Sequence, residues 1–149
     1  MNKKNIPNVT IYTDGACDPN PGQGGWAALI LFSDLQKEIT GQEGHSTNNR
    51  MELMAAIKAL QVLQTPSHVK FFTDSQYLKL GVEEWMPNWI KRGWKRKAGK
   101  VANIDLWQEL NIESQKHLIE WNWVRGHSGD PHNERVNLLA QRSIHTRII

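Results

Sequence analysis

The sequence has little cysteine and no long apolar run. Cys17 is the only cysteine among 149 residues, so no disulfide can form within the chain, which favours a reducing compartment. No apolar stretch approaches the roughly 20 residues that a membrane-spanning helix needs. The first eight residues, MNKKNIPN, lack the apolar segment of a signal peptide. We therefore expect a cytoplasmic protein that does not enter a membrane.

Acidic residues are missing from one short stretch, residues 91–100 (KRGWKRKAGK). This stretch holds six of the 18 lysines and arginines, and the 12 elsewhere are outnumbered by the 15 acids. A run of positive charge is usually a solvated loop, but a tryptophan among the cations and the lack of acids favour a surface that binds nucleic-acid phosphates. The sequence therefore predicts a slightly acidic body with one basic projection.

The order of apolar patterns predicts five strands. The first three should form an antiparallel meander, whereas the strands separated by helices imply parallel crossovers. The stretch DPNPGQGG, rich in proline and glycine, is expected to be a loop after the first strand. The predicted strands lie at about 8–14, in WAALILF and QKEITGQE around a turn at Ser33–Asp34, in HVKFFTDS and in HLIEWNWV.

Helical periodicity occupies the segments between the later strands. Helices are predicted in STNNRMELMAAIKALQVL, in NIDLWQELNIESQK and from about 132 to 145. Shorter helical pieces from Ser75 to Trp94 should be broken at Gly81, Pro87 and Gly93. The predicted fold is a single α/β domain over residues 1–149, with one mixed five-stranded sheet and helices on both faces. We expect a basic protrusion at about 85–103, and we assign Trp107, Trp121 and Trp123 to the core.

Two of the predicted strands end alike, in IYTDG (11–15) and FFTDS (71–75). Either aspartate alone would be read as a turn residue that terminates its strand. If the two strands are parallel neighbours, however, Asp14 and Asp74 lie at the same carboxyl edge of the sheet, where open α/β sheets bind ligands. The repeated context favours this functional interpretation.

A third acid, Glu52, lies early in a predicted helix. Its neighbours at i+4 and i+7 are Ala56 and Ala59, which indicates that Glu52 points toward the sheet, although a glutamate on the helix surface is the alternative. Three carboxylates at one edge repel each other unless cations bind, and hard oxygen ligands suit Mg²⁺ or Mn²⁺. Two such ions can stabilise the attacking and leaving oxygens of a phosphodiester displacement.

Four segments resemble, in order and spacing, the motifs of type 1 ribonuclease H. They are YTDGACDPNPGQGGWA, STNNRMELMAAI, FFTDSQYL and VRGHSGDPHNERVN. The likeness extends from about Val9 to Ala140 and includes the basic insertion of the bacterial form. The resemblance implies the ribonuclease H-like fold and a monomeric endonuclease that hydrolyses the RNA strand of RNA–DNA hybrids. It implies two Mg²⁺ ions, for which Mn²⁺ could substitute, and products with 5′-phosphate and 3′-hydroxyl ends.

The resemblance also assigns roles to residues. Asp14 matches the carboxylate that touches both ions, and Glu52 and Asp74 match the other acidic ligands. His127 matches a loop histidine that assists proton transfer or product departure, and an imidazole with a pKa near 6.5 can carry either protonation state. The family's usual fourth acid is replaced by Asn137, whose amide oxygen can ligate a metal without adding negative charge. We therefore expect weaker metal affinity or a less activated water, and not loss of activity.

Further residues match positions that contact the substrate. Short polar side chains suit the minor groove, where the 2′-hydroxyl distinguishes RNA from DNA, although capping and turn formation are the alternative for the asparagines. Thr47 and Asn103 match a pocket for a phosphate of the DNA strand. The minor-groove set is Cys17, Asn20, Asn48, Asn49 and Gln76, and the set in the protrusion is Trp85, Trp89, Lys91, Arg92, Trp94, Lys95, Arg96 and Lys97.

The sequence leaves two other functions to be weighed. Asn137 could mark a module that binds hybrids but has lost catalysis, although the three acids and His127 are retained. A resolvase or integrase core would share the overall fold, but such cores lack this glycine-rich first loop and this protrusion.

Overall fold

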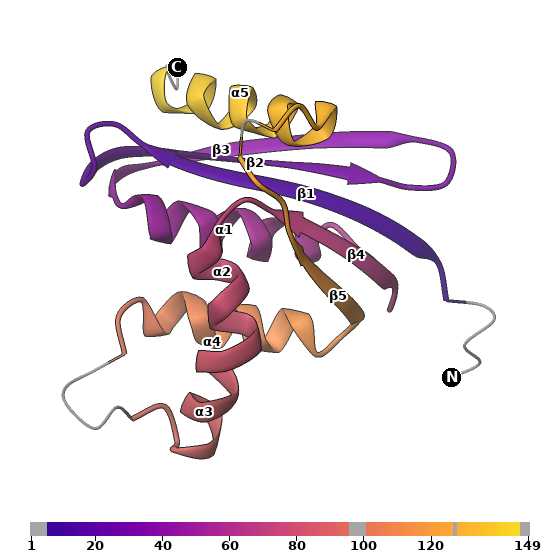
Figure 1. The fold of residues 1–149 in the computed structure, drawn as a ribbon, viewed down its shortest axis with the longest axis vertical. Coiled ribbons are helices and arrows are strands. Elements are labelled where there is room, and N and C mark those ends of the chain that lie inside the picture. The colour runs from indigo at the N-terminus through magenta and orange to yellow at the C-terminus, as the bar shows by residue number, and fades with distance from the viewer. Residues whose placement is uncertain (1–5, 96–100, 127, 147–149) are drawn as a thin grey trace.

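The described residues of the computed structural model, 6–95, 101–126 and 128–146, form one five-stranded sheet with the order β3-β2-β1-β4-β5 (Figure 1). β1, β2 and β3 are antiparallel neighbours, whereas β4 runs parallel to β1 and β5 runs parallel to β4. The predicted mixed sheet is therefore confirmed. Its strands are β1 (Asn8–Cys17), β2 (Gly22–Leu31), β3 (Gln36–Ser46), β4 (His68–Thr73) and β5 (Leu118–Trp123).

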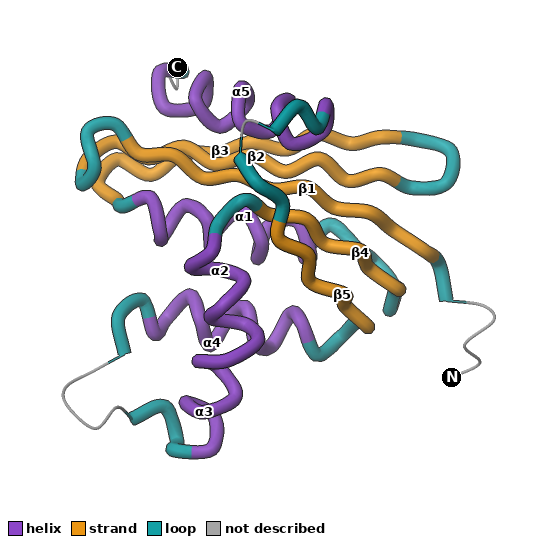
Figure 2. The backbone as a smooth tube through the Cα atoms, in the orientation of Figure 1, coloured by secondary structure: helices purple, strands orange, loops and turns teal. Residues whose placement is uncertain are grey.

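Helices cover both faces of the sheet, as predicted (Figure 2). α5 packs on β1, β2 and β3, and α1 packs on the opposite face between the sheet and α4. In the described parts of the chain, no helix is both long and apolar enough to cross a membrane. The helices are α1 (Asn48–Gln61), α2 (Gln76–Leu80), the π-helical turn η2 (Gly81–Trp85), α3 (Met86–Lys91), α4 (Ile104–Ser114) and α5 (Pro131–His145).

The central strand β1 contributes to two hydrophobic clusters because successive side chains of a strand point to opposite faces. Ile11 belongs to the larger cluster, which lies on the α1 side of the sheet. Tyr12 and Ala16 belong to the smaller cluster, which includes Val136 and Ala140 of α5. β1 is therefore fixed against helices on both faces, which makes it a rigid support for a side chain near its end.

The predicted loop DPNPGQGG is shorter than expected, because β2 begins at Gly22. The glycines of this segment pair with β1 and β3, and Gly25 also lies beneath α5. A Cβ atom on Gly25 would come within 2.7 Å of the Ala140 carbonyl oxygen. The glycines that indicated a loop therefore serve as strand residues where a helix crosses closely.

Two of the predicted helix breaks are wrong, because α2, η2 and α3 follow one another without an intervening loop. Gly81 is buried within this helical run. Pro87 stands at the junction of η2 and α3, where the helical hydrogen bonding changes from the π to the α pattern. The run ends at Lys91, two residues before Gly93, which has a positive φ of 64°.

The assignment of three tryptophans to the core is correct for Trp107 and wrong for Trp123. Trp107 is fully buried, and Trp121 is partly buried against the same cluster. Trp123 is 41% exposed, because it lies at the end of the edge strand β5.

Candidate active site

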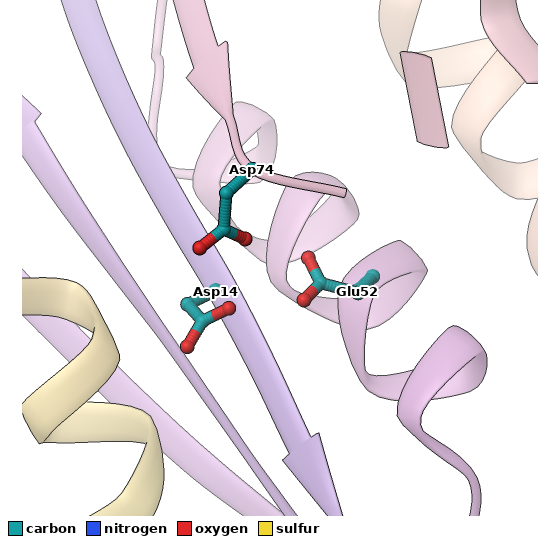
Figure 3. A group of neighbouring side chains, drawn as sticks. All are labelled: Asp14, Glu52 and Asp74. Carbon is teal, nitrogen blue, oxygen red and sulfur yellow. The ribbon is translucent and has the colours of Figure 1, made fainter. Parts of the chain in front are cut away.

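Three carboxylates converge at the carboxyl edge of the sheet. Asp14 lies near the end of β1, Asp74 follows β4 directly, and Glu52 projects from α1 (Figure 3). Thr13 pairs with Thr73 across the parallel strands, so the next residue of each strand reaches the same place. One carboxylate oxygen of each acid lies within 4.8 Å of those of the other two. The structure thus brings together the three acids that the sequence singled out.

Glu52 is buried, with 6% of its surface exposed. The backbone N–H of Gly15 donates a hydrogen bond of 3.0 Å to its Oε1 atom. A Cβ atom on Gly15 would lie 2.4 Å from the Glu52 nitrogen, so only glycine allows β1 to approach α1 this closely. The other oxygen, Oε2, is buried and has no hydrogen-bond partner among the described residues. This oxygen therefore requires a ligand or a proton to offset the cost of its burial.

The electrostatics of the three acids also favour a cation. Burial and the nearby Asp74 carboxylate raise the pKa of Asp14 to about 7. Burial and the nearby Asp14 carboxylate raise the pKa of Glu52 well above its usual range. In the absence of positive charge the protein therefore resists full ionisation of the trio. Hard carboxylate oxygens in this arrangement fit Mg²⁺ or Mn²⁺.

Asn137 of α5 lies against two of the three acids. With its NH₂ group toward them, the amide donates to Asp14 Oδ2 at 2.9 Å and to Asp74 Oδ2 at 3.3 Å. In the opposite orientation its carbonyl oxygen faces the same carboxylates and could ligate a cation. The side chain is therefore at the site. The orientation with the NH₂ group inward suits the site without a cation, and the orientation with the oxygen inward suits the site with a cation.

An open cleft of about 590 Å³ surrounds these groups. Besides Asn137, three further residues of α5 line this cleft, and sequence reasoning missed them. Helical spacing gives the signal, because residues 134, 137, 138 and 141 lie on one face of the helix at i, i+3, i+4 and i+7. The cleft is lined by Asp14, Gly15, Asn48, Asn49, Glu52, Asp74, Ser75, Gly126, Glu134, Asn137, Leu138 and Gln141.

Several predicted minor-groove residues gather at the start of α1. The side chain of Asn20 accepts a hydrogen bond of 3.2 Å from the backbone N–H of Asn48, which ties the loop after β1 to the helix. Asn48 and Asn49 line the cleft. The Cys17 thiol lies within 3.2–3.3 Å of the carbonyl oxygens of residues 19, 22 and 46 and so also helps to hold this loop. Gln76 is exposed at the start of α2.

The predicted phosphate pocket contains an arginine that sequence reasoning missed. Thr47 is the N-cap of α1, and its hydroxyl accepts from the Arg50 backbone N–H at 3.2 Å. The Arg50 guanidinium donates to Asn103 Oδ1 at 3.4 Å and forms an ion pair with Asp105. Thr47 therefore caps α1, and its hydroxyl hydrogen remains able to meet a phosphate. The sequence pattern that could have identified Arg50 is a positive charge in the first turn of a helix, next to three polar residues.

The tryptophans predicted to contact substrate pack on the core instead of projecting from it. Trp85, Trp89 and Trp94 are half-buried, and each lies 6.2–6.3 Å from the next, ring centre to ring centre. Only their exposed parts can meet a substrate. Lys91, Arg92 and Lys95 are exposed, and none of them forms an ion pair within the described part of the chain. The predicted site residues Arg96, Lys97 and His127 lie outside the described residues.

The chain is similar to known ribonucleases H over almost its whole length. The family model described as RNase H matches residues 7–145. Ribonuclease H of Alcanivorax borkumensis is 56% identical over 140 residues, covering 93% of each chain. Ribonuclease H of Xanthomonas campestris pv. campestris is 53% identical over 137 residues, covering 91% of each chain.

Solved structures give the same result. LC9-RNase H1, described as a type 1 RNase H with the type 2 active-site motif, is 34% identical with a TM-score of 0.87, covering 94% of this chain and 73% of that one. LC11-RNase H1, solved in complex with an RNA/DNA hybrid, is 20% identical with a TM-score of 0.70, covering 92% and 96%, and shows likeness of fold alone. The resemblance read from four motifs is therefore confirmed, and the chain belongs to the ribonuclease H family.

Proposed function

We propose that this protein is an endonuclease that hydrolyses the RNA strand of RNA–DNA hybrids. Membership of the ribonuclease H family supports the reaction class. The observation that carries the proposal is the trio Asp14, Glu52 and Asp74, in which a buried Glu52 oxygen has no hydrogen-bond partner among the residues that the structure describes. A domain that only bound nucleic acid would gain nothing from gathering three acids, two of them buried, at the surface that meets a polyanion.

The donor set of the trio fits two Mg²⁺ ions, with Mn²⁺ as a substitute. Ions bound there would activate a water molecule and stabilise the leaving oxygen of the phosphodiester. Asp14, Glu52 and Asp74 would hold the ions, and the family resemblance implies that Asp14 would contact both of them. Asn137 would offer its carbonyl oxygen as a neutral ligand.

The proposed hydrolysis breaks the bond between phosphorus and the 3′ oxygen of the RNA. The water oxygen adds to phosphorus, which leaves a 5′-phosphate, and the released 3′ oxygen takes up a proton to become a 3′-hydroxyl. We assign assistance in proton transfer or product departure to His127. This assignment rests on the family resemblance, because His127 lies outside the described residues.

Recognition of the hybrid is proposed to use three surfaces. The polar residues at the start of α1 would read 2′-hydroxyls in the minor groove. Thr47, Asn103 and Arg50 would bind a phosphate of the DNA strand. The exposed cations Lys91, Arg92 and Lys95 would neutralise further phosphates. We propose that the protein acts as a monomer in the cytoplasm.

Cleavage of matched duplexes of one sequence tests the proposal. Hybrid, double-stranded RNA and double-stranded DNA are each incubated with Mg²⁺, with Mn²⁺ and with a chelator. We expect cleavage of the hybrid alone, and only with metal. Binding of the hybrid without cleavage would favour the binding module, and cleavage of double-stranded DNA would favour a resolvase or integrase core.

A further inference from the structure

We infer that Glu134 supplies the fourth negative charge of the metal site, acting through water in place of the acid that Asn137 replaces. This inference rests on the proposed function, because it concerns the metal bound by the same trio. It assigns a role to a residue that the sequence motifs did not single out.

Glu134 lies one helical turn before Asn137 on the same face of α5. Both residues line the cleft that contains the three acids, and so do Leu138 and Gln141. Positions at i, i+3, i+4 and i+7 share one face of a helix. The face of α5 that bears Glu134 is therefore the face presented to the cleft.

The charge of Glu134 is not neutralised by any ion pair within the described residues. The adjacent cation, Arg135, is occupied elsewhere: it donates to both carboxylate oxygens of Glu38 on β3, at 2.7 and 3.0 Å. Glu134 is also exposed, so water can reach its carboxylate. A full negative charge therefore stands at the rim of the cleft.

A second observation indicates that a cation binds at this site. The buried Oε2 atom of Glu52 has no hydrogen-bond partner among the described residues, although the cleft opens beside it. With Asn137 neutral, the trio alone provides three negative charges against the four positive charges of two divalent ions. Glu134 would make the charges equal.

The exposed position of Glu134 fits a contact through water better than direct ligation. Mg²⁺ gives up its waters reluctantly and keeps several of them in protein sites. A carboxylate at the rim can accept hydrogen bonds from those waters and attract the ion over a distance of several ångströms. For a divalent ion and a carboxylate about 7 Å apart in a mostly aqueous medium, this attraction corresponds to a roughly threefold to tenfold gain in affinity.

Calorimetric titration with Mg²⁺ tests the role of Glu134 without an activity assay. Glu134→Gln should weaken Mg²⁺ binding by about threefold to tenfold. Glu134→Asp keeps the charge and should stay within about twofold of the unchanged protein. Glu109→Gln, an exposed glutamate on α4, makes the same charge change outside the cleft and is the matched control. The Mg²⁺ dependence of Tm gives a second readout of the same binding.

The same substitution in an Asn137→Asp protein separates charge compensation from a structural effect. The double variant carries the same site charge as the unchanged protein, so it should regain Mg²⁺ affinity to within about twofold of that protein. Equal affinities for Glu134→Gln and Glu109→Gln would overturn the inference and leave the proposed function intact. An unchanged protein that bound no Mg²⁺ would overturn both.

Discussion

Asp14 lies close to each of the other polar residues of the site. It is 8% exposed, lies beside Glu52 and Asp74, and is within hydrogen-bonding reach of Asn137. Burial and the neighbouring Asp74 raise its pKa to about 7. A folded-state pKa above the unfolded value means that ionising Asp14 destabilises the metal-free fold.

This shift predicts the pH dependence of stability without metal. The stabilisation associated with protonated Asp14 is complete below the ordinary pKa near 4 and is lost as the pH rises through about 7. Thermal melts in a chelator should therefore show Tm falling from pH 5 to pH 8 in the unchanged protein. Asp14→Asn should show a smaller fall and a Tm several degrees higher at pH 8. Parallel curves for the two proteins would contradict the assigned burial of this charge.

Asn137 makes a second prediction at the scale of one residue. Asn137→Asp restores an anion, so it should keep or raise the cleavage rate and should lower the Mg²⁺ concentration for half-maximal rate. Asn137→Ala removes the oxygen and should lower the rate by tens-fold, which corresponds to roughly 2–3 kcal/mol. Rates are compared at saturating Mg²⁺. Equal rates for Asn137→Ala and the unchanged protein would make Asn137 an ordinary helix residue.

At the scale of elements, the placement of α5 determines where Asn137 and Glu134 stand. Asp130 caps this helix, and its carboxylate accepts from the backbone N–H groups of His132 and Asn133. The His132 ring also packs on Tyr12 of β1, with 5.0 Å between ring centres. The first turn of α5 is thus attached to the strand that carries Asp14.

Removal of the cap should loosen this attachment. Asp130→Ala should lower the free energy of unfolding by about 1 kcal/mol, because two N–H groups lose their acceptor. Asp130→Asn is the matched control, since asparagine caps helices about as well and should retain most of the stability. Denaturant unfolding measures both. Equal stability of the alanine and aspartate forms would mean that the cap contributes nothing.

The basic segment that follows α3 gives a prediction about substrate binding. Replacement of Lys91, Arg92 and Lys95 by alanine should raise KM for the hybrid with a smaller effect on kcat. Each lost phosphate contact should also reduce the slope of log affinity against log salt by about one unit. Steady-state kinetics at several salt concentrations measure both effects.

A control with the same loss of charge distinguishes contact from general electrostatics. Lys37, Lys58 and Lys70 are exposed on β3, α1 and β4, outside the basic segment. Their triple replacement by alanine should leave KM and the salt slope nearly unchanged. If both triple variants behaved alike, the segment would be a solvated loop.

At the scale of the whole molecule, the strand order brings distant parts of the chain together. β1 lies at the centre of the sheet, with β4 beside it and α1 and α5 on its two faces. Residues 14, 52, 74 and 137 therefore meet, although they are far apart in sequence. Parallel pairing of β1 and β4 places their carboxyl ends at one edge, which is where sheets of this class bind ligands.

Much of this arrangement could be predicted, because it depends on local patterns. The repeated TD at two strand ends identified Asp14 and Asp74, and small neighbours identified the inward direction of Glu52. The glycines at the start of β2 were misread because two of them allow close tertiary contacts, Gly24 with Met51 of α1 and Gly25 with α5. Trp123 was misplaced because sequence does not reveal which strand forms the edge of a sheet.

The contributions of Arg50 and Glu134 required the structure. A charged residue on a helix is usually solvated, and only the packing of α1 against α4 shows that Arg50 meets Asn103 and Asp105. Similarly, the orientation of α5 about its axis decides that Glu134 faces the cleft. The periodicity of the sequence shows which residues share a face of α5, but it does not show whether that face points toward the cleft.

Cleavage of a hybrid labelled separately on its two strands tests the central proposal most directly. With Mg²⁺, the protein should cut only the RNA strand and leave 5′-phosphate and 3′-hydroxyl ends. Asp14→Asn, which keeps the shape of the side chain, should reduce the rate by at least about a thousandfold, or roughly 4 kcal/mol in the barrier. Near-normal cleavage by Asp14→Asn, or cutting of the DNA strand, would contradict the proposed carboxylate site.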